Sequence, residues 1–475
     1  MKFTAPNNHN FYEESPLTES DLKSAFGARK TLVQKELFSS VFELTTKSSS
    51  LEQMELFRFK PVRNKLDEEK QLILKLFAQE DRGSSKKYIV QTGLFAGVVY
   101  HNNCQFNITT RYGKHFLNRM LNYVNDIYVD NQDTLVEKSD HTNEFQKIIV
   151  YLFIQSLERA SVLGLPKTYQ TLSQHGHKVR GKIDVNAYLK NNIPFTGKIT
   201  TSYREQIYVQ EIIDVLYVCC LQLESNYGNT IKRKLLGVYQ LLKQHYSGRY
   251  PQNSTIQEAK KHSVLSNPMF EGYKKVLSYA EIILKEKSLQ LHSNSNLSTK
   301  GYLFDIAQLF EVYLEKLLDR HFEDWYITGQ EEINTYDSMF YGRKMFPDIV
   351  MRHKYSKDVI VFDAKFKNML SRKQDIDRID FYQIHSYIQY YQPQVLFGGL
   401  IYPLGKKLNK TKAHSNNLFG QIQHDNGFVV DGISVDPSMS MHEIIENEND
   451  FISRLNELIC RKQELRINEN SLETV

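Results

Sequence analysis

The sequence is poor in cysteine and has no apolar run long enough to cross a membrane. Its four cysteines form no CxxC pair, which argues against a zinc knuckle or a disulfide framework. The most apolar stretch, 148–165, contains Glu158 and Arg159, whereas a membrane span needs about 20 uncharged residues. Residues 1–20 lack the apolar core of a signal peptide. We therefore expect a protein of the reducing cytoplasm with no membrane partner.

Nucleotide-binding and hydrolase signatures are also missing. There is no GxxxxGK[ST] phosphate loop, and the nearest stretch, GLIYPLGKK, has the wrong spacing and a lysine in place of serine or threonine. No Rossmann fingerprint, zinc protease helix or GxSxG elbow is present. The chain is therefore not expected to bind a nucleotide itself.

Net charge is small, but it is unevenly distributed. The chain carries 60 Lys and Arg against 55 Asp and Glu, a formal excess of +5. Between residues 341 and 378 there are ten Lys or Arg and five Asp, so this segment has the same excess as the whole chain. A solvated charged face is the simple explanation. A nucleic-acid surface beside a catalytic site is the alternative.

At 475 residues the chain is long enough for two or three domains. Residues 1–90 show helix-like periodicity through 19–42 and 66–77, and 87–113 has the alternation of short antiparallel strands. Long helices follow to about 290, and the Ser- and Asn-rich stretch 291–300 is the best linker candidate. We predict a mixed α/β protein divided into 1–90 of unknown role, 91–300 as a β unit plus helical region, and 301–475 as a catalytic domain.

The chemistry is concentrated in FPDIVMRHKYSKDVIVFDAKF, which has two apolar runs around a polar turn and predicts a β-hairpin. Asp348 stands at the head of the first strand. Asp363 and Lys365 are two residues apart in the second strand, so both side chains lie on one face of the sheet. Carboxylates with a nearby ammonium are what a Mg²⁺-dependent phosphodiesterase needs. For a bare DxK, an amphipathic surface strand is the competing interpretation.

Three residues outside the hairpin are further candidates. Glu311 lies in the helical pattern LFDIAQLFEVYLEKLLDRHF, from which it can join Asp348 and Asp363 as a metal ligand or pair with a lysine at helical spacing. Gln383 and Tyr387 lie four residues apart in the helical stretch DFYQIHSYIQYY, where they can contact the site or belong to the core. The run QVLFGGLIYPL after them predicts a buried strand that extends the sheet.

Two other constellations carry less weight. His175 and His177 form an HxH without a third ligand nearby in sequence. Four arginines of the upstream region can contact phosphates or stimulate a partner's GTPase, although surface solvation explains each of them singly. They are Arg111, Arg119, Arg180 and Arg204.

These motifs in this order resemble the PD-(D/E)xK nuclease superfamily, and more closely the McrC family, the nuclease subunit of McrBC-type 5-methylcytosine-dependent restriction systems. LlaJI-type restriction subunits are a related possibility. The matching segments are LFEVYLEKLL, FPDIVM, VIVFDAKFK, DFYQIHSY and LIYP. The likeness is close over 303–403 and looser upstream, and 1–90 are an extension relative to shorter family members.

The resemblance implies a Mg²⁺-dependent endonuclease, with Mn²⁺ able to substitute, that cuts DNA containing modified cytosine. It also implies a GTP-hydrolysing AAA+ partner, a McrB-like hexameric ring. Region 91–300 is expected to dock to this ring, and the family's N-terminal region enters the ring's centre and stimulates its GTPase. Dimerisation of assembled complexes would supply two cutting sites. Two other interpretations stay open: a non-enzymatic adaptor of a ring NTPase, and a stand-alone restriction or repair nuclease.

Overall fold

The structure is a computed structural model. It describes residues 2–6, 38, 41–49, 54–60, 71–80, 86–101, 104–124, 144–191, 194, 196–227, 235–291, 300–334, 344–367, 376–405 and 427–473. The chain forms two compact units. The first unit joins Met1–Asp130 to Asn294–Val475, and the second unit is Asn131–Ser293. The predicted linker 291–300 lies almost wholly outside the described residues, and the division into three consecutive domains stays a prediction.

Two sheets form the N-terminal part of the first unit. One has the strand order β1-β7-β6-β11-β3, and the other has the order β2-β4-β5. Their strands are β1 (Lys2–Pro6), β2 (Phe42–Thr45), β3 (Met54–Phe57), β4 (Leu72–Glu80), β5 (Lys86–Thr92), β6 (Phe95–His101), β7 (Cys104–Thr109) and β11 (Lys300–Asp305). The antiparallel strands expected within 87–113 are confirmed. β11 pairs with β6 and β3, so the segment that leads into the candidate site motifs begins in the N-terminal sheet.

The helix predicted over 66–77 is wrong, because the described part of this segment belongs to β4, which pairs with β2 and β5. Ile73, Leu74 and Leu76 are fully buried there. Their spacing fits either period, and the sheet partners that decide between the two are distant in sequence. The helix predicted over 19–42 lies mostly outside the described residues.

A mixed five-stranded sheet forms the C-terminal part of the first unit. Its order is β12-β15-β16-β17-β18, with β12, β15 and β16 antiparallel and β16, β17 and β18 parallel. The strands are β12 (Trp325–Gly329), β15 (Ile349–His353), β16 (Val359–Ala364), β17 (Val395–Leu404) and β18 (Phe428–Ser434), beside a small pair of β13 (Ile333–Asn334) and β14 (Lys344–Met345). The predicted hairpin is β15 and β16, and the predicted buried strand is β17.

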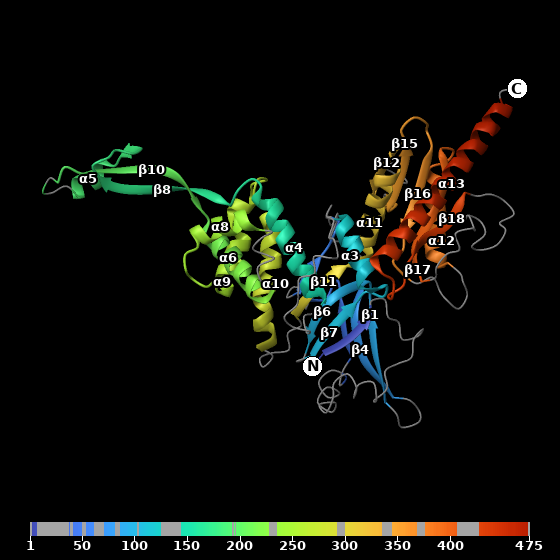
Figure 1. Ribbon diagram of the computed structural model, residues 1–475, viewed down its shortest axis with the longest axis horizontal. Helices are drawn as coiled ribbons and strands as arrows, with labels where there is room; N and C mark the ends of the chain where they lie inside the picture. Colours follow the sequence, from blue (N-terminus) through green and yellow to red (C-terminus); the bar gives the residue numbers. More distant parts are fainter. Residues whose placement is uncertain are drawn as a thin grey trace. The chain divides into compact units, whose positions relative to one another are not determined.

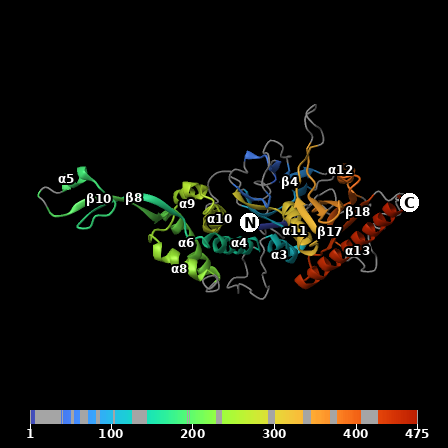
Figure 2. The same cartoon turned by 90° about the horizontal axis from the view of Figure 1, so that it is seen from above.

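Helices cover both faces of this sheet (Figures 1 and 2). On one face α12 (Arg378–Tyr390) packs on Val361 and Leu400 in a common core cluster. It approaches closely because Gly398 faces it, where an added Cβ would lie 2.5 Å from Ile388. The other face meets α11 (Ile306–His321) through Phe366 and also α13 (Met441–Glu473), with α3 (Gly113–Val124) packed on both helices. The predicted mixed α/β fold with a helix-flanked mixed sheet is confirmed.

A buried ion pair connects these helices. The Arg119 guanidinium on α3 donates to both carboxylate oxygens of Glu448 on α13 at 2.6–3.0 Å. The Tyr313 hydroxyl on α11 donates to the same carboxylate. Arg119 and Glu448 are almost completely buried. Arg119 is therefore neither solvated nor available to a partner, which corrects both interpretations offered for it above: it holds three distant segments of the chain together.

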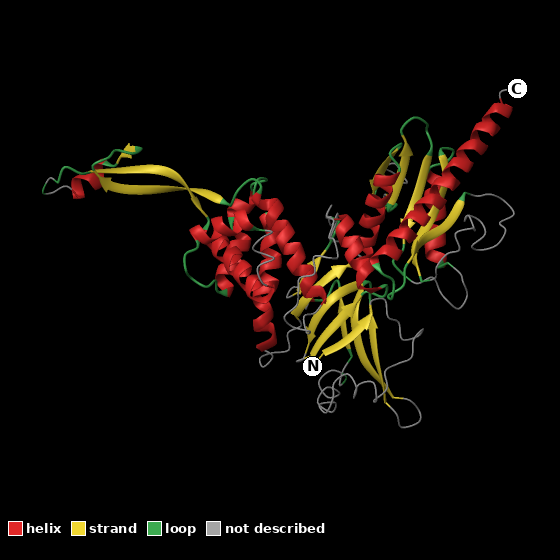
Figure 3. Cartoon of the chain, viewed as in Figure 1, coloured by secondary structure: helices red, strands yellow, loops and turns green. Residues whose placement is uncertain are grey.

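The second unit is a helical bundle that carries a two-stranded arm. The bundle contains α4 (Glu144–Ser161), α6 (Gln210–Tyr227), α8 (Leu236–His245), α9 (Asn253–Lys261), a short 3₁₀ helix η3 (Ser263–Ser266) and α10 (Tyr273–Leu291). The arm is β8 (Lys167–Gly176) paired antiparallel with β10 (Ile199–Tyr208), with β9 (Lys182–Ile183) and α5 (Val185–Asn191) at its tip, and Figure 3 shows its long strands. Most of its side chains are exposed. No helix in the described ranges is both long and apolar enough for a membrane span.

Candidate functional site

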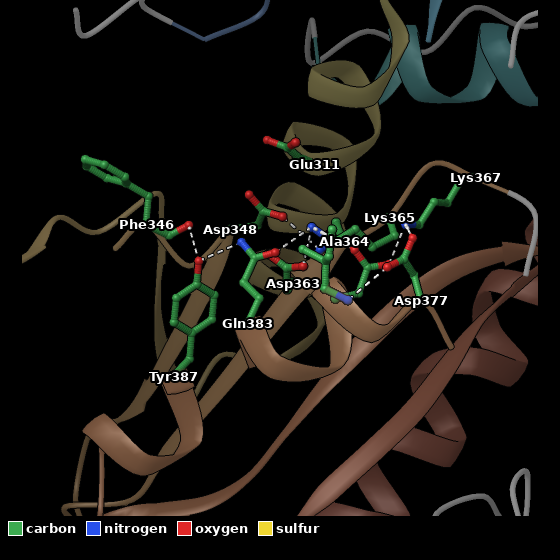
Figure 4. Close-up of polar contacts among 12 residues, drawn as sticks. Glu311, Phe346, Asp348, Asp363, Ala364, Lys365, Lys367, Asp377, Gln383 and Tyr387 are labelled. Atoms are coloured by element: carbon green, nitrogen blue, oxygen red, sulfur yellow. Dashed lines mark hydrogen bonds and ion pairs between the residues drawn. The ribbon is translucent and has the colours of Figure 1, made fainter. Parts of the chain in front are cut away.

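The hairpin of β15 and β16 places Asp348 beside Asp363. Asp348 comes directly before β15, and its Oδ2 accepts a hydrogen bond of 2.9 Å from the backbone N–H of Ala364. Its backbone carbonyl accepts another from Gln330. Asp363 lies near the end of β16 with only 1% of its surface exposed. Figure 4 shows both carboxylates with Lys365, and Glu311 on α11 above them.

The side-chain alternation of β16 continues as predicted. Phe362 and Phe366 point to the α11 side, where Phe366 contacts Phe310 with ring centroids 5.5 Å apart. Lys365 points to the opposite side with Asp363, and its Nζ lies 2.6 Å from Asp363 Oδ2. The predicted alternation is therefore confirmed, but the face that carries Asp363 is also buried, because Val361 on that face packs under α12.

Helix α12 holds the lysine from its other side. Lys365 Nζ donates to Gln383 Oε1 at 3.2 Å, and Gln383 Nε2 donates to the Tyr387 hydroxyl at 2.9 Å. Tyr387 in turn donates to the carbonyl of Phe346, two residues before Asp348. The predicted pair on α12 thus joins the predicted hairpin in one hydrogen-bonded chain (Figure 4).

Glu311 reaches the same region from α11, with a lysine from the N-terminal region attached to it. Lys60 Nζ lies 2.6 Å from Glu311 Oε2, and the two side chains are only 8% and 15% exposed. Gln330 Nε2 lies 3.5 Å from the same oxygen. Gln330 has φ +48°, and no other non-glycine residue in the described ranges has a positive φ. Such backbone strain is common at functional sites.

The carboxyl pKa values show that negative charge is crowded here. Burial, and then the charge of Asp348, raise the pKa of Glu311 to about 8 despite Lys60. The same two causes raise the pKa of Asp363 well above its usual value, against the opposing effect of Lys365. Burial lowers the pKa of Lys365, but Asp363 and Asp348 more than offset this, so its pKa is raised and it keeps its proton at neutral pH. Burial raises the pKa of Tyr387 to about 12.

Three residues at the site have no role in the sequence interpretation. Asp380 on α12 is buried and takes Lys367 at 2.6 Å, with Lys365 at 3.9 Å. The sequence could have predicted Asp380 as a site residue, because it lies one helical turn before Gln383 in the motif DFYQIHSY. Lys60 and Gln330 had no such signal: Lys60 is 251 residues from Glu311 along the chain.

The donor set fits a hard divalent ion held by two carboxylates. Across the described part of the chain, no three His, Cys, Asp or Glu side chains are arranged to hold a metal as they stand. Mg²⁺ is commonly bound through only one or two carboxylates, with water and substrate phosphate completing the octahedron. Asp348 and Asp363, whose shared negative charge raises the pKa of Asp363, form such a pair. Glu311 is the third carboxylate, and its Oε2 is paired with the ammonium of Lys60.

The other candidates form ordinary contacts of the second unit's arm. His175 Nδ1 lies 2.8 Å from Thr200 Oγ1, and His177 Nδ1 lies 3.2 Å from the carbonyl of Gly197. Arg180 pairs with Glu205 at 3.0 Å, and Arg204 lies over the ring of Tyr169. These residues stay available for a partner because the arm is largely exposed. Arg111 lies in the first unit, in the turn before α3.

The chain matches the family model described as "McrBC 5-methylcytosine restriction system component" over residues 83–403, more than half of its length. No curated protein matches it. Its structure is similar to a chain of the solved half-complex from a tetradecameric assembly of Thermococcus gammatolerans McrB AAA+ hexamers with bound McrC, with TM-score 0.56 and 13% identity over 96% of this chain and 100% of that one.

A chain of the Thermococcus gammatolerans McrBC complex gives a TM-score of 0.33 and 15% identity over 68% of this chain and 88% of that one. A TM-score this low supports no conclusion about the fold. The likeness to the half-complex supports the mixed α/β fold. The family match confirms the resemblance seen in the motifs of residues 303–403, and on that match the chain belongs to the family of McrBC 5-methylcytosine restriction system components.

Proposed function

We propose that the chain is the Mg²⁺-dependent, PD-(D/E)xK-type DNA endonuclease subunit of a modification-dependent restriction system. One observation carries the proposal: Asp348, Asp363 and Lys365 converge at the end of a buried hairpin, in a chain of the McrBC family. Asp363 is buried with Lys365 as its counter-charge, and a metal with substrate phosphate would stabilise the remaining negative charge of the two aspartates.

Each residue has a part in this mechanism. Asp348 and Asp363 would hold the ion, with Glu311 as a third ligand. A bound Mg²⁺ supplies polarisation of the phosphoryl oxygen and a water of lowered pKa. Lys365 stays protonated, so it balances negative charge developing at the phosphate rather than taking up a proton. Gln383 and Tyr387 hold the lysine in place through their hydrogen bonds.

The proposed partners are DNA containing modified cytosine and a GTP-hydrolysing AAA+ ring of the McrB kind. The structural neighbour comes from an assembly of McrB AAA+ hexamers with bound McrC, which supports such a partner. The arm of β8 and β10 is the best docking element, because it lies outside the bundle core and exposes Tyr169 on β8 and, at its tip, Val179 and Ile183. Through it the chain would stimulate the partner's GTPase.

The test is cleavage of cytosine-methylated plasmid by the purified chain with its motor partner, GTP and Mg²⁺. We expect cutting that requires every component and that stops with Asp363→Ala. The matched control is Asp324→Asn, an exposed aspartate of the same domain, which should cut normally. Cleavage that survives Asp363→Ala would contradict the proposal.

Omitting single components separates the rival functions. Cutting without partner or nucleotide would identify a stand-alone nuclease. GTPase stimulation that persists without any divalent-ion binding to the isolated chain or any cleavage would identify a non-enzymatic adaptor.

A further inference from the structure

Lys60 lies at the proposed cutting centre but comes from a part of the chain with no assigned role. Its ammonium is bonded to Glu311 at 2.6 Å, and the lysine side chain is 92% buried. Burying a lysine ammonium costs free energy, and only well-placed carboxylate partners offset that cost.

The fold fixes this lysine from both sides. β3 pairs in parallel with β11, with Phe57 opposite Phe304, and β11 runs directly into α11. Beyond β3, the backbone N–H groups of Phe59 and Lys60 both approach Gln308 Oε1, at 3.2 and 3.4 Å. Gln308 lies one helical turn before Glu311. The lysine and the carboxylate are therefore positioned by the same two neighbouring elements.

The charges explain what such a lysine does. The centre holds three carboxylates (Asp348, Asp363 and Glu311) and two ammonium groups (Lys60 and Lys365), which sum to −1 when all are ionised. Lys365 pairs with Asp363, whereas Lys60 takes the one carboxylate that would complete a three-ligand metal site. An ammonium this close also repels an arriving divalent ion.

We propose that Lys60 is a built-in competitor of the catalytic metal: its ammonium occupies Glu311 and keeps the affinity of the centre for a divalent ion low. Metal binding through three carboxylates requires Lys60 to leave Glu311. This inference rests on the proposed function, since it takes Asp348 and Asp363 as the metal-binding pair. It assigns to the N-terminal region a control over the nuclease centre.

The test is calorimetric titration of the full chain with Mn²⁺, with and without duplex DNA. Lys60→Gln should bind the ion at least about tenfold more tightly than wild type, because it removes one nearby positive charge. Lys60→Arg keeps the charge and should bind as wild type does. Lys47→Gln removes an exposed lysine of the same region and should also leave the affinity unchanged. Equal or weaker binding by folded Lys60→Gln would overturn the proposal.

Two further measurements keep the result interpretable. In a Mn²⁺-bound structure of the wild-type chain, Lys60 Nζ should have left Glu311, and an ion bound with that contact intact would overturn the proposal even if Lys60→Gln does not fold. Asp348→Asn tests the proposed function separately. If that variant binds Mn²⁺ as wild type does, the metal site itself is wrongly placed; if only Lys60→Gln fails to change affinity, the error lies in the role of Lys60.

Discussion

Two glutamates with little exposed surface, one in each unit, have opposite pKa shifts although lysine contacts both. Burial raises the pKa of Glu281 on α10, but Lys260 at 2.6 Å and Lys285 more than offset this, so the pKa is lowered. Glu311 on α11 has one lysine and the neighbouring charge of Asp348, and its pKa rises to about 8.

This difference separates a structural ion pair from the proposed metal-binding centre. At Glu281 the cations outnumber the carboxylates, so the ionised form is stabilised by the fold. At Glu311 the carboxylates outnumber the cations, so the fold retains negative charge that an additional cation would stabilise. Perturbed pKa values of the second kind are typical of functional sites.

The Arg119–Glu448 pair is a second structural ion pair, like that of Glu281, and breaking it should cause the largest loss of stability. Glu448→Gln leaves a buried guanidinium without its counter-charge, which costs about 3–5 kcal/mol of unfolding free energy. Denaturant unfolding of the full chain measures this. Glu446→Gln, an exposed glutamate on the same helix, should change stability by less than about 0.5 kcal/mol. If Glu448→Gln lowers the unfolding free energy by less than about 1 kcal/mol, the Arg119–Glu448 pair does not stabilise the fold to the expected extent.

Substituting Lys365 tests the proposed metal-binding centre. Lys365→Gln removes the ammonium that faces Asp363, and single-turnover cleavage by the assembled complex should slow about 100- to 1000-fold. The control is Lys357→Gln, an exposed lysine in the turn between β15 and β16, which should leave the cleavage rate unchanged. Equal rates for wild type and Lys365→Gln would show that the charge at this position has no part in the chemistry.

Substituting the two glutamates sharpens the comparison directly. Glu281→Gln should cost about 1–3 kcal/mol at pH 7, because it removes the anion that two lysines and Gln257 contact. Glu311→Gln should cost less than Glu281→Gln at that pH, because burial and the charge of Asp348 already disfavour the ionised form that the substitution removes. Similar losses for both variants would erase the distinction.

The same variants predict opposite pH dependences. The lowered pKa of Glu281 contributes stability that is present above its ordinary value of 4.5 and is lost as pH falls through the lowered one. The raised pKa of Glu311 contributes stability that is full below 4.5 and is lost as pH rises through about 8. The difference in unfolding free energy between wild type and each Gln variant, measured from pH 4 to 9, should therefore slope in opposite directions.

The exposed pair of the arm should show the smallest effect. Arg180 and Glu205 are about half and one third exposed, so solvent screens the pair and Arg180→Ala should leave the free energy of unfolding nearly unchanged. If the arm docks to the motor partner, the same variant should weaken GTPase stimulation more than it weakens folding. A clear drop in melting temperature would instead give this pair a structural role.

The hairpin of β15 and β16 could be predicted from the sequence because the residues that determine it lie close together along the chain. The two-residue spacing of Asp363 and Lys365 fixes their common face, and the apolar runs around the turn fix the pairing of β15 with β16. The four-residue spacing of Gln383 and Tyr387 placed them together on α12 in the same way.

What the sequence could not predict depends on distant contacts. Lys60 meets Glu311 only because β3 and β11 are neighbours in a sheet assembled from both ends of the chain. Arg119 looked like a surface residue because its partner Glu448 is 329 residues away. The spacing of apolar residues over 66–77 predicts a helix, but β4 forms there because its conformation depends on its sheet partners β2 and β5.

The central claim is that Asp348 and Asp363 bind the divalent ion, and Mn²⁺ titration of their asparagine variants tests it most directly. The account predicts that both Asp348→Asn and Asp363→Asn lose the binding heat of the wild-type chain, while Asp324→Asn keeps it. Unchanged binding by both folded variants would contradict the account.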